Sequence, residues 1–153
     1  SKDEQIALVV DMIKEYGLNY IEDPFHEDDF ASFSVLMKKI SSHNMKCLLA
    51  ADDLTATQFK RVEMAVKEKC VNALIVNPNQ NGSLLETKRI VDFAKDNNIA
   101  PIISHRSGET MDNTIAHLAV GWQCPIIKTG ILGKERFAKL NEILRIERKA
   151  AGK

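Results

Sequence analysis

The sequence predicts an α/β protein built on a parallel sheet, with one helix followed by about five strand–helix units. Short apolar segments alternate along the whole chain with longer segments whose apolar residues recur at helical spacing, in units of roughly 25 to 30 residues. The short segments are almost entirely apolar, as expected of strands that are buried on both faces. Each short segment also ends in a polar or charged residue, which is typical of the ligand-binding edge of a parallel sheet.

Size and composition are those of one globular domain, which we expect to span residues 1–153. Lys+Arg and Asp+Glu are both 21, so the charge balance gives no reason to expect a nucleic-acid or membrane partner. The apolar runs are far shorter than the roughly 20 residues needed to cross a bilayer. The polar start of the chain is unlike a secretory signal, and the three cysteines form no CxxC pair. We therefore expect a cytoplasmic protein.

The first half of the chain supplies three strands. Residues 4–16 have the spacing of one helix face, and Gly17 is a natural end for that helix. A strand is expected at 18–21, followed by a helix from Phe30 to Ile40, a second strand at 46–51 and a helix at 57–69. The third strand is expected at 71–76, before a turn that extends to Gly82.

The second half continues the alternation. Ser83 and Glu86 have the spacing of a capping box, which predicts a helix that runs to about Asp96. The fourth strand is expected at 100–103, with a helix leading to Trp122. A short fifth strand at 125–127 precedes a last helix, and residues 148–153 are expected to be a frayed basic tail.

The candidate site comes from the residues that end the five strands, which are Glu22, Asp52, Asn77, His105 and Lys128. Because the carboxyl ends of parallel strands face one side, these residues should converge on one pocket. Two carboxylates could hold magnesium, while Arg106 and Lys128 could bind anionic oxygens. The backbone amides of Ser107 and Gly108, expected near a helix N-terminus, suit a phosphate. The pattern favours a magnesium-dependent site for a phosphorylated anion.

Simpler interpretations of the acidic residues remain open. The segment around Glu22 could be a strand that leads into a solvated acidic turn. Asp23 and Asp53 could cap or hydrogen-bond while Glu22 and Asp52 coordinate the metal, or could supply a third ligand. Glu27 to Asp29 suit the N-terminus of the following helix through its dipole.

Several motifs stand out along the chain, which are Ile21-Glu22-Asp23-Pro24-Phe25, Asp52-Asp53-Leu54-Thr55, Asn79-Gln80, Ser104-His105-Arg106-Ser107-Gly108-Glu109-Thr110 and Ile127-Lys128-Thr129-Gly130. Collinear from about Gly17 to Glu147, they resemble enolase, the magnesium-dependent phosphopyruvate hydratase. The resemblance implies a partial TIM-like (β/α) barrel that corresponds to the C-terminal part of the enolase barrel. It also implies that the family's N-terminal domain and first barrel strands are absent from this chain.

The resemblance also implies roles for single residues. Glu22 and Asp52 resemble two of the family's three magnesium ligands. Arg106 and Ser107 match the residues that hold the substrate phosphate, and His105 matches a histidine that lines the substrate pocket. Lys128 matches a lysine that contacts the substrate carboxylate.

Two departures affect the expected function. The lysine with which the family removes the proton at carbon 2 falls on Asn77, and an amide cannot serve as a base near neutral pH. Met111 replaces a usual acidic residue, which is a milder change. With only two of three carboxylates, the magnesium site is expected to be weak or incomplete.

Three hypotheses for function follow. The first is an enolase-family protein whose ligand is a phosphorylated three-carbon acid, but which is inactive alone. The second is a non-catalytic binding or assembly subunit that self-associates or completes a barrel with a complementing enolase-like chain. The third is a chain with no selected activity.

Overall fold

The computed structural model describes residues 1–152 and contains one five-stranded parallel sheet. The strands are β1 (Tyr20–Glu22), β2 (Leu48–Ala51), β3 (Ala73–Val76), β4 (Ala100–Ser104) and β5 (Ile126–Lys128). They pair in sequence order, each parallel to the next, so every connection is a helical crossover of the kind that parallel strands require. The predicted five-stranded parallel arrangement is confirmed.

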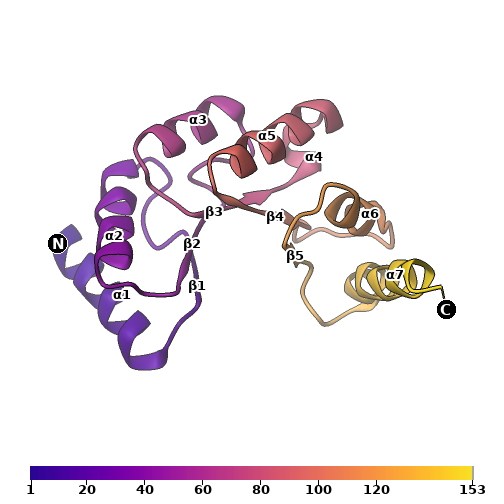
Figure 1. The fold of residues 1–153 in the computed structure, drawn as a ribbon, viewed down its shortest axis with the longest axis horizontal. Coiled ribbons are helices and arrows are strands. Elements are labelled where there is room, and N and C mark those ends of the chain that lie inside the picture. Colours follow the sequence, from indigo (N-terminus) through magenta and orange to yellow (C-terminus); the bar gives the residue numbers. More distant parts are fainter. Residues whose placement is uncertain (153) are drawn as a thin grey trace.

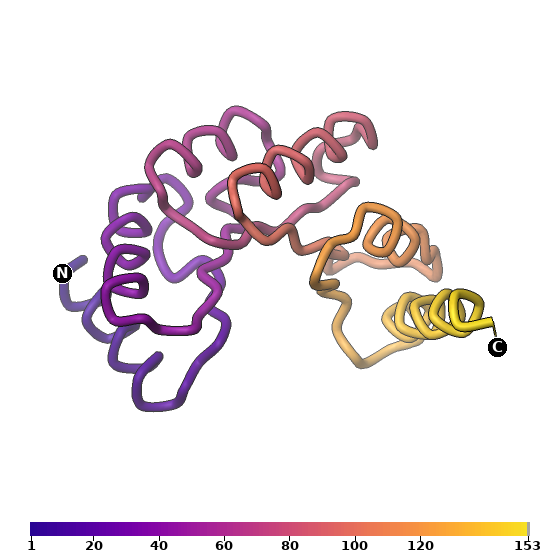
Figure 2. The backbone as a smooth tube through the Cα atoms, in the orientation of Figure 1, coloured from indigo at the N-terminus to yellow at the C-terminus, as the bar shows by residue number. Residues whose placement is uncertain are grey.

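Helices alternate with these strands. They are α1 (Lys2–Tyr16), α2 (Phe30–Ser42), α3 (Phe59–Lys67), α4 (Pro78–Asn81), α5 (Leu84–Asp96), α6 (Thr114–Gly121) and α7 (Lys134–Ala150). Figure 1 shows an arch whose sheet lines the concave side, with α2, α3, α5 and α6 on the convex side. The tube in Figure 2 follows the chain from the N-terminus at one end of the arch to the C-terminus at the other. The structure is therefore half of a barrel.

Local signals explain several element ends. Gly17 ends α1 in the left-handed region with φ of 61°, which costs glycine little. Ser83 caps α5 by accepting a hydrogen bond from the Glu86 amide, and Asp29 caps α2 in the same way from Ser32. Both helices start where the sequence predicts.

Two element predictions were wrong. The turn before Gly82 contains the short helix α4, which starts with a proline at a position where the missing N–H costs nothing. Helix α7 runs to Ala150, so residues 148–150 are helical and not a frayed tail. Lys and Arg keep good helix propensity at an exposed end, and the basic last turn suits the helix dipole.

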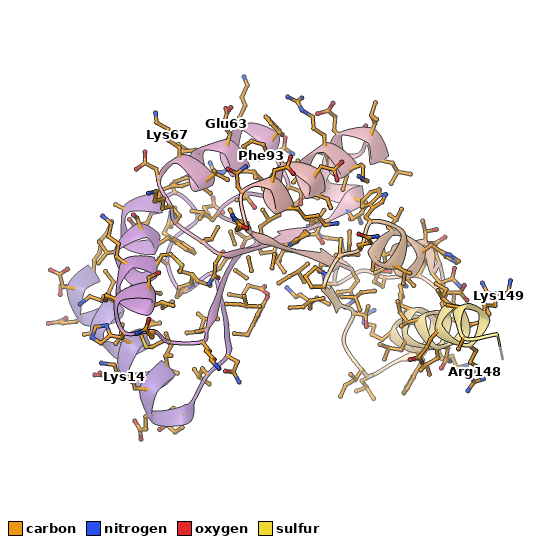
Figure 3. All side chains as sticks on the ribbon, in the orientation of Figure 1. Lys14, Glu63, Lys67, Phe93, Arg148 and Lys149 are labelled. Carbon is orange, nitrogen blue, oxygen red and sulfur yellow. The ribbon has the colours of Figure 1, made fainter. Side chains whose placement is uncertain are left out.

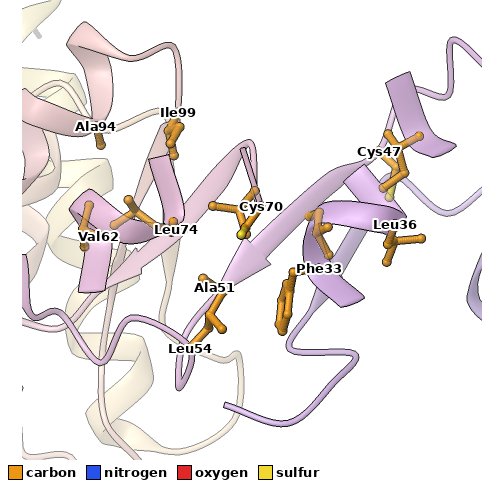
Figure 4. Close-up of a cluster of buried hydrophobic side chains, with 14 of the residues drawn as sticks. Phe33, Leu36, Cys47, Ala51, Leu54, Val62, Cys70, Leu74, Ala94 and Ile99 are labelled. Carbon is orange, nitrogen blue, oxygen red and sulfur yellow. The ribbon is translucent and has the colours of Figure 1, made fainter. Parts of the chain in front are cut away.

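The main core lies between the sheet and the helices of the convex side. Figure 4 shows part of it, with Phe33 and Leu36 of α2 facing Ala51 and Cys70, and Leu74 beside Val62 of α3. A second, smaller cluster lies on the concave face of the sheet and consists of Ala50, Ala73, Ile75 and Ile102. Both faces of the sheet are therefore apolar, as the continuous apolar strands predict.

Charged side chains extend from the outer surface. Figure 3 shows long charged side chains such as Glu63, Lys67 and Lys149 extending away from the ribbon. Cys47 and Cys70 are buried, whereas Cys124 is half-buried, and all three thiols are free. Among residues 1–152, every helix is either too short or too polar to cross a membrane.

Candidate functional site

The predicted site residues meet at the carboxyl ends of the strands. A cavity of about 290 Å³ is lined by Asp52, Asp53, Asn77, Gln80, His105, Arg106, Ser107 and Lys128. Of the five strand-end residues, Glu22 alone does not line it, and it joins the group through a contact with Lys128. These residues come from the strands, from the loops that directly follow them or, for Gln80, from α4. The structure therefore brings these side chains to one edge of the sheet, with Glu22 beside the cavity; the roles assigned to them stay predictions.

Lys128 links the two outer strands of the sheet across the mouth of the arch. Its Nζ lies 2.5 Å from Glu22 Oε1 on β1 and 3.3 Å from Asp52 Oδ2 after β2. Burial alone would lower the pKa of the Lys128 ammonium, but the two carboxylates outweigh burial and raise that pKa. Lys128 is therefore charged near neutral pH and neutralises part of the acidic pair.

Hydrogen bonds hold the neighbouring carboxylates of Glu22 and Asp23 in place. The Tyr20 hydroxyl donates to Glu22 Oε2 from two residues earlier on β1, on the same face of the strand. Asp23 accepts hydrogen bonds from the backbone amides of Asp52 and Asp53, at 3.1 and 2.6 Å. Both Asp23 oxygens are thereby used to join β1 to the loop after β2, which agrees with the interpretation that Asp23 hydrogen-bonds.

Asn77 is buried beside Asp52. Its side-chain nitrogen donates to Asp52 Oδ1 at 3.2 Å, and its backbone amide donates to Thr57 Oγ1 at 2.9 Å. Asn77 Oδ1 has no partner among residues 1–152. The side chain at this strand end is therefore a neutral amide, which can donate and accept hydrogen bonds but cannot take up a proton near neutral pH.

His105, Arg106 and Ser107 form the anion side of the cavity. The His105 backbone amide donates to the Lys128 carbonyl at 3.0 Å, which continues the β4–β5 pairing beyond the strand end. Burial and the Arg136 guanidinium lower the pKa of His105, so its imidazole is neutral near pH 7. Two cationic side chains and a neutral imidazole thus face the cavity.

One expectation about this loop was wrong. The Ser107 and Gly108 amides do not lie at a helix N-terminus, because α6 begins only at Thr114, with Asn113 as its cap. The intervening residues form a turn in which Asp112 accepts a hydrogen bond from the Thr114 amide at 2.9 Å. Anion binding here must therefore rely on the side chains and loop amides without help from the dipole of α6.

The acidic residues do not form a complete magnesium site. No group of three or more His, Cys, Asp or Glu side chains that could hold a metal ion exists within residues 1–152. The two predicted ligands, Glu22 and Asp52, both contact the Lys128 ammonium, which takes the position of a cation between them. Magnesium requires near-octahedral oxygen coordination, which two carboxylates already paired with an ammonium do not supply.

Sequence reasoning missed four side chains around the site, which are Tyr20, Glu109, Arg136 and Lys139. Tyr20 could have been found, because it precedes Glu22 by two residues on one strand and so shares its face. Glu109 stood within the quoted motif without a role. Nothing in the sequence of α7 indicated that its cations would reach the loop after β4.

Comparisons with known proteins agree with this architecture. The family model for the enolase C-terminal TIM barrel domain matches residues 1–153. The chain is 44% identical to an enolase of Natronomonas pharaonis over 150 residues, which cover 98% of this chain and 37% of the relative. It is 46% identical to an enolase of Methanosphaera stadtmanae over 145 residues, covering 95% of this chain and 34% of the relative. The chain thus spans about a third of the length of the curated relatives it matches, and it belongs to the enolase family, within the C-terminal barrel domain.

Proposed function

We propose that this chain binds a phosphorylated three-carbon acid at the cavity lined by Asn77, Arg106 and Lys128, and that it does not interconvert 2-phosphoglycerate and phosphoenolpyruvate by itself. The observation that carries the proposal is Asn77. The cavity has cations for an anionic ligand, but the strand end at which the family has its lysine base presents an amide.

Binding is supported by the charges of the cavity. The Arg106 guanidinium can donate two parallel hydrogen bonds to phosphate oxygens, and the Ser107 hydroxyl lies next to it in the chain. The Lys128 ammonium is paired with Glu22 and Asp52. It can still take the carboxylate of a ligand as an additional partner. His105 can donate from a neutral imidazole.

Proton abstraction is not supported by any side chain of the cavity. Lys128 is held in its charged form by Glu22 and Asp52, so it carries no free electron pair near pH 7. His105 is neutral, but its lowered pKa makes it a weaker base than a free imidazole. A positioned general base contributes about 10²- to 10⁴-fold to rate, so its loss alone would make turnover slow.

Glu22 and Asp52 are the residues that would contact magnesium, but both are already paired with the Lys128 ammonium. Because both carboxylates contact Lys128, we propose that this chain binds magnesium weakly. Weak binding also agrees with the absence of a third carboxylate in the group formed by residues 1–152.

The test is a pair of measurements on the purified chain. Calorimetry should detect binding of phosphoenolpyruvate, and the Arg106→Met variant should lose it, while Arg89→Met, which changes a distant surface cation, should not. Absorbance at the enol band should show no magnesium-dependent conversion of 2-phosphoglycerate. Robust turnover by this chain would refute the proposed inactivity, and equal binding by wild type and Arg106→Met would refute the proposed site.

A second candidate function is assembly with a second copy or with a complementing enolase-like chain. Strands β1 and β5 each pair on one side only within residues 1–152, so two rows of backbone groups are open to another strand. Apolar side chains are exposed near both ends of the arch, including Leu8 and Tyr16 of α1 and Ile131 and Leu132 after β5. These features favour a partner that covers the open edges.

A further inference from the structure

Lys139 is the most deeply buried charged side chain outside the cavity. It belongs to α7, its side chain is 1% exposed, and its Nζ lies 2.6 Å from Glu109 Oε2. The same ammonium donates a hydrogen bond to the Thr110 carbonyl. Lysine is almost never fully buried unless its charge is paired, because removing an ammonium from water costs several kcal/mol. A lysine in such a position therefore has its partners fixed in one arrangement.

Glu109 connects this buried ammonium to the anion side of the cavity. Its second oxygen, Oε1, accepts a hydrogen bond from the Arg106 backbone amide at 3.0 Å. Burial alone would raise the pKa of Glu109, but the Arg106 amide and the Lys139 ammonium outweigh burial and hold the pKa below its ordinary value. Glu109 is therefore a carboxylate near neutral pH, and it can accept from both groups at once.

A second cation of the same helix holds the loop from its other end. Arg136 lies one turn before Lys139, and its Nη2 donates to the Ser107 carbonyl at 3.0 Å. Residues 105–113 contain no helix or strand, so their conformation depends on such contacts. Ser107, Thr110 and, through Glu109, Arg106 are all tied to one face of α7.

We propose that Lys139 is a positioning residue for the anion site, which orders the Arg106–Ser107 segment through Glu109 and the Thr110 carbonyl. This inference rests on the proposed function, because it assigns the order of a loop to the binding of an anion. In this arrangement α7 fixes the backbone of Arg106, so that the guanidinium starts close to its binding geometry. A ligand then meets a loop that is already ordered, and less conformational entropy is lost on binding.

The principal test is the Lys139→Met variant, which keeps the length of the side chain but removes the ammonium. We expect at least a tenfold weaker affinity for phosphoenolpyruvate by calorimetry, and at least tenfold faster hydrogen exchange of the Arg106 amide. The exchange measurement is specific, because a general loss of packing around α7 would not single out this amide. Arg145→Met is the matched control, since Arg145 pairs with Glu142 on the same helix but does not contact the loop.

A second variant covers the case in which Lys139→Met does not fold. Glu109→Gln keeps the shape of the acceptor but removes its charge and one of its two acceptor oxygens. It should also speed exchange at Arg106 and weaken phosphoenolpyruvate binding, by at least threefold each. Unchanged exchange and affinity in whichever of the two variants folds would overturn the positioning role.

The two proposals fail in different ways. If the wild-type chain does not bind phosphoenolpyruvate, the proposed function is wrong, but exchange of the Arg106 amide still reports whether Lys139 orders the loop. If the wild type binds and Lys139→Met binds equally well with unchanged exchange, only the positioning role is wrong.

Discussion

At the scale of single residues, the site is defined by which charges meet. Glu22 and Asp52, at the ends of the neighbouring strands β1 and β2, would repel each other, and the Lys128 ammonium contacts both at 2.5 and 3.3 Å. The ammonium is thus an internal counter-ion for the pair. A dissolved divalent cation has to compete with it for the same oxygens.

The variant Lys128→Met should therefore bind magnesium more tightly. Removing the ammonium leaves two carboxylates free to take a cation, so we expect the magnesium dissociation constant to fall about tenfold at pH 7. Calorimetric titration of both proteins measures this. Lys88→Met is the control, because Lys88 also pairs with a carboxylate, Asp92, but on the surface of α5. Equal magnesium affinities for wild type and Lys128→Met would contradict the role of Lys128 as a counter-ion.

Gly130 permits the close approach of the loop after β5 to the site. Its φ is +69°, and a Cβ there would lie 3.3 Å from Arg136 Cγ and 3.6 Å from His105 Cε1. Gly130→Ala should lower the free energy of unfolding by about 1–2 kcal/mol from the backbone alone, with a further loss from the contact. Gly17→Ala provides the comparison, because Gly17 has φ of +61° with open space around it. Urea denaturation should show the larger loss for Gly130→Ala, and the reverse order would contradict this account.

At the scale of elements, helix starts are where local sequence has its clearest effect. Asp29 caps α2 by accepting from the Ser32 amide at 3.2 Å, and its other oxygen pairs with Lys2 of α1 at 2.6 Å. One carboxylate therefore both begins a helix and ties it to the preceding one. The sequence predicted that the acidic run before Phe30 favours the helix start through the helix dipole, but neither the cap nor the ion pair with Lys2.

Replacing Asp29 should separate these two roles. Asp29→Ala loses the cap and the ion pair, at a cost of about 1 kcal/mol for the cap, whereas Asp29→Asn keeps a capping oxygen. The Lys2 ammonium, followed by the Ser32 bonds, holds the pKa of Asp29 below its ordinary value of 3.8. Its charge therefore stabilises the fold fully above that value, and the contribution is lost as the pH falls through the lowered pKa.

Urea denaturation at a series of pH values measures both effects. The gap in unfolding free energy between wild type and Asp29→Asn should be constant from pH 7 to about pH 4.5 and should narrow below it. The gap between Asp29→Asn and Asp29→Ala should persist at every pH. A difference between wild type and Asp29→Asn that grows on acidification would contradict the assigned sign.

At the scale of the whole molecule, the strand order could be predicted because it depends on regular features. Continuous apolar strands and helical spacing predict a parallel sheet, and the polar strand ends from Glu22 to Lys128 predict the site edge. The ion pair between Lys128 and Glu22 could not be predicted, because it depends on the curvature of the five-stranded sheet. The contact between Lys139 and Glu109 could not be predicted either, because it depends on how α7 is rotated about its own axis. The place of Lys139 in the sequence of α7 is equally compatible with an exposed side chain.

The same open architecture predicts association. With β1 and β5 each paired on one side within residues 1–152, the chain presents two open sheet edges, and Ile131 and Leu132 are 81% and 86% exposed. Light scattering across a range of micromolar concentrations should give a mass above the 17.2 kDa of one chain.

The double variant Ile131→Asp, Leu132→Asp should lower that mass, because charge at an apolar contact must be desolvated on association. Val35→Asp on the outer side of α2 serves as the control for added charge. If the wild type has the mass of one chain at every concentration, its open sheet edges do not require a partner. If the double variant and Val35→Asp have equal masses, association does not use the loop after β5.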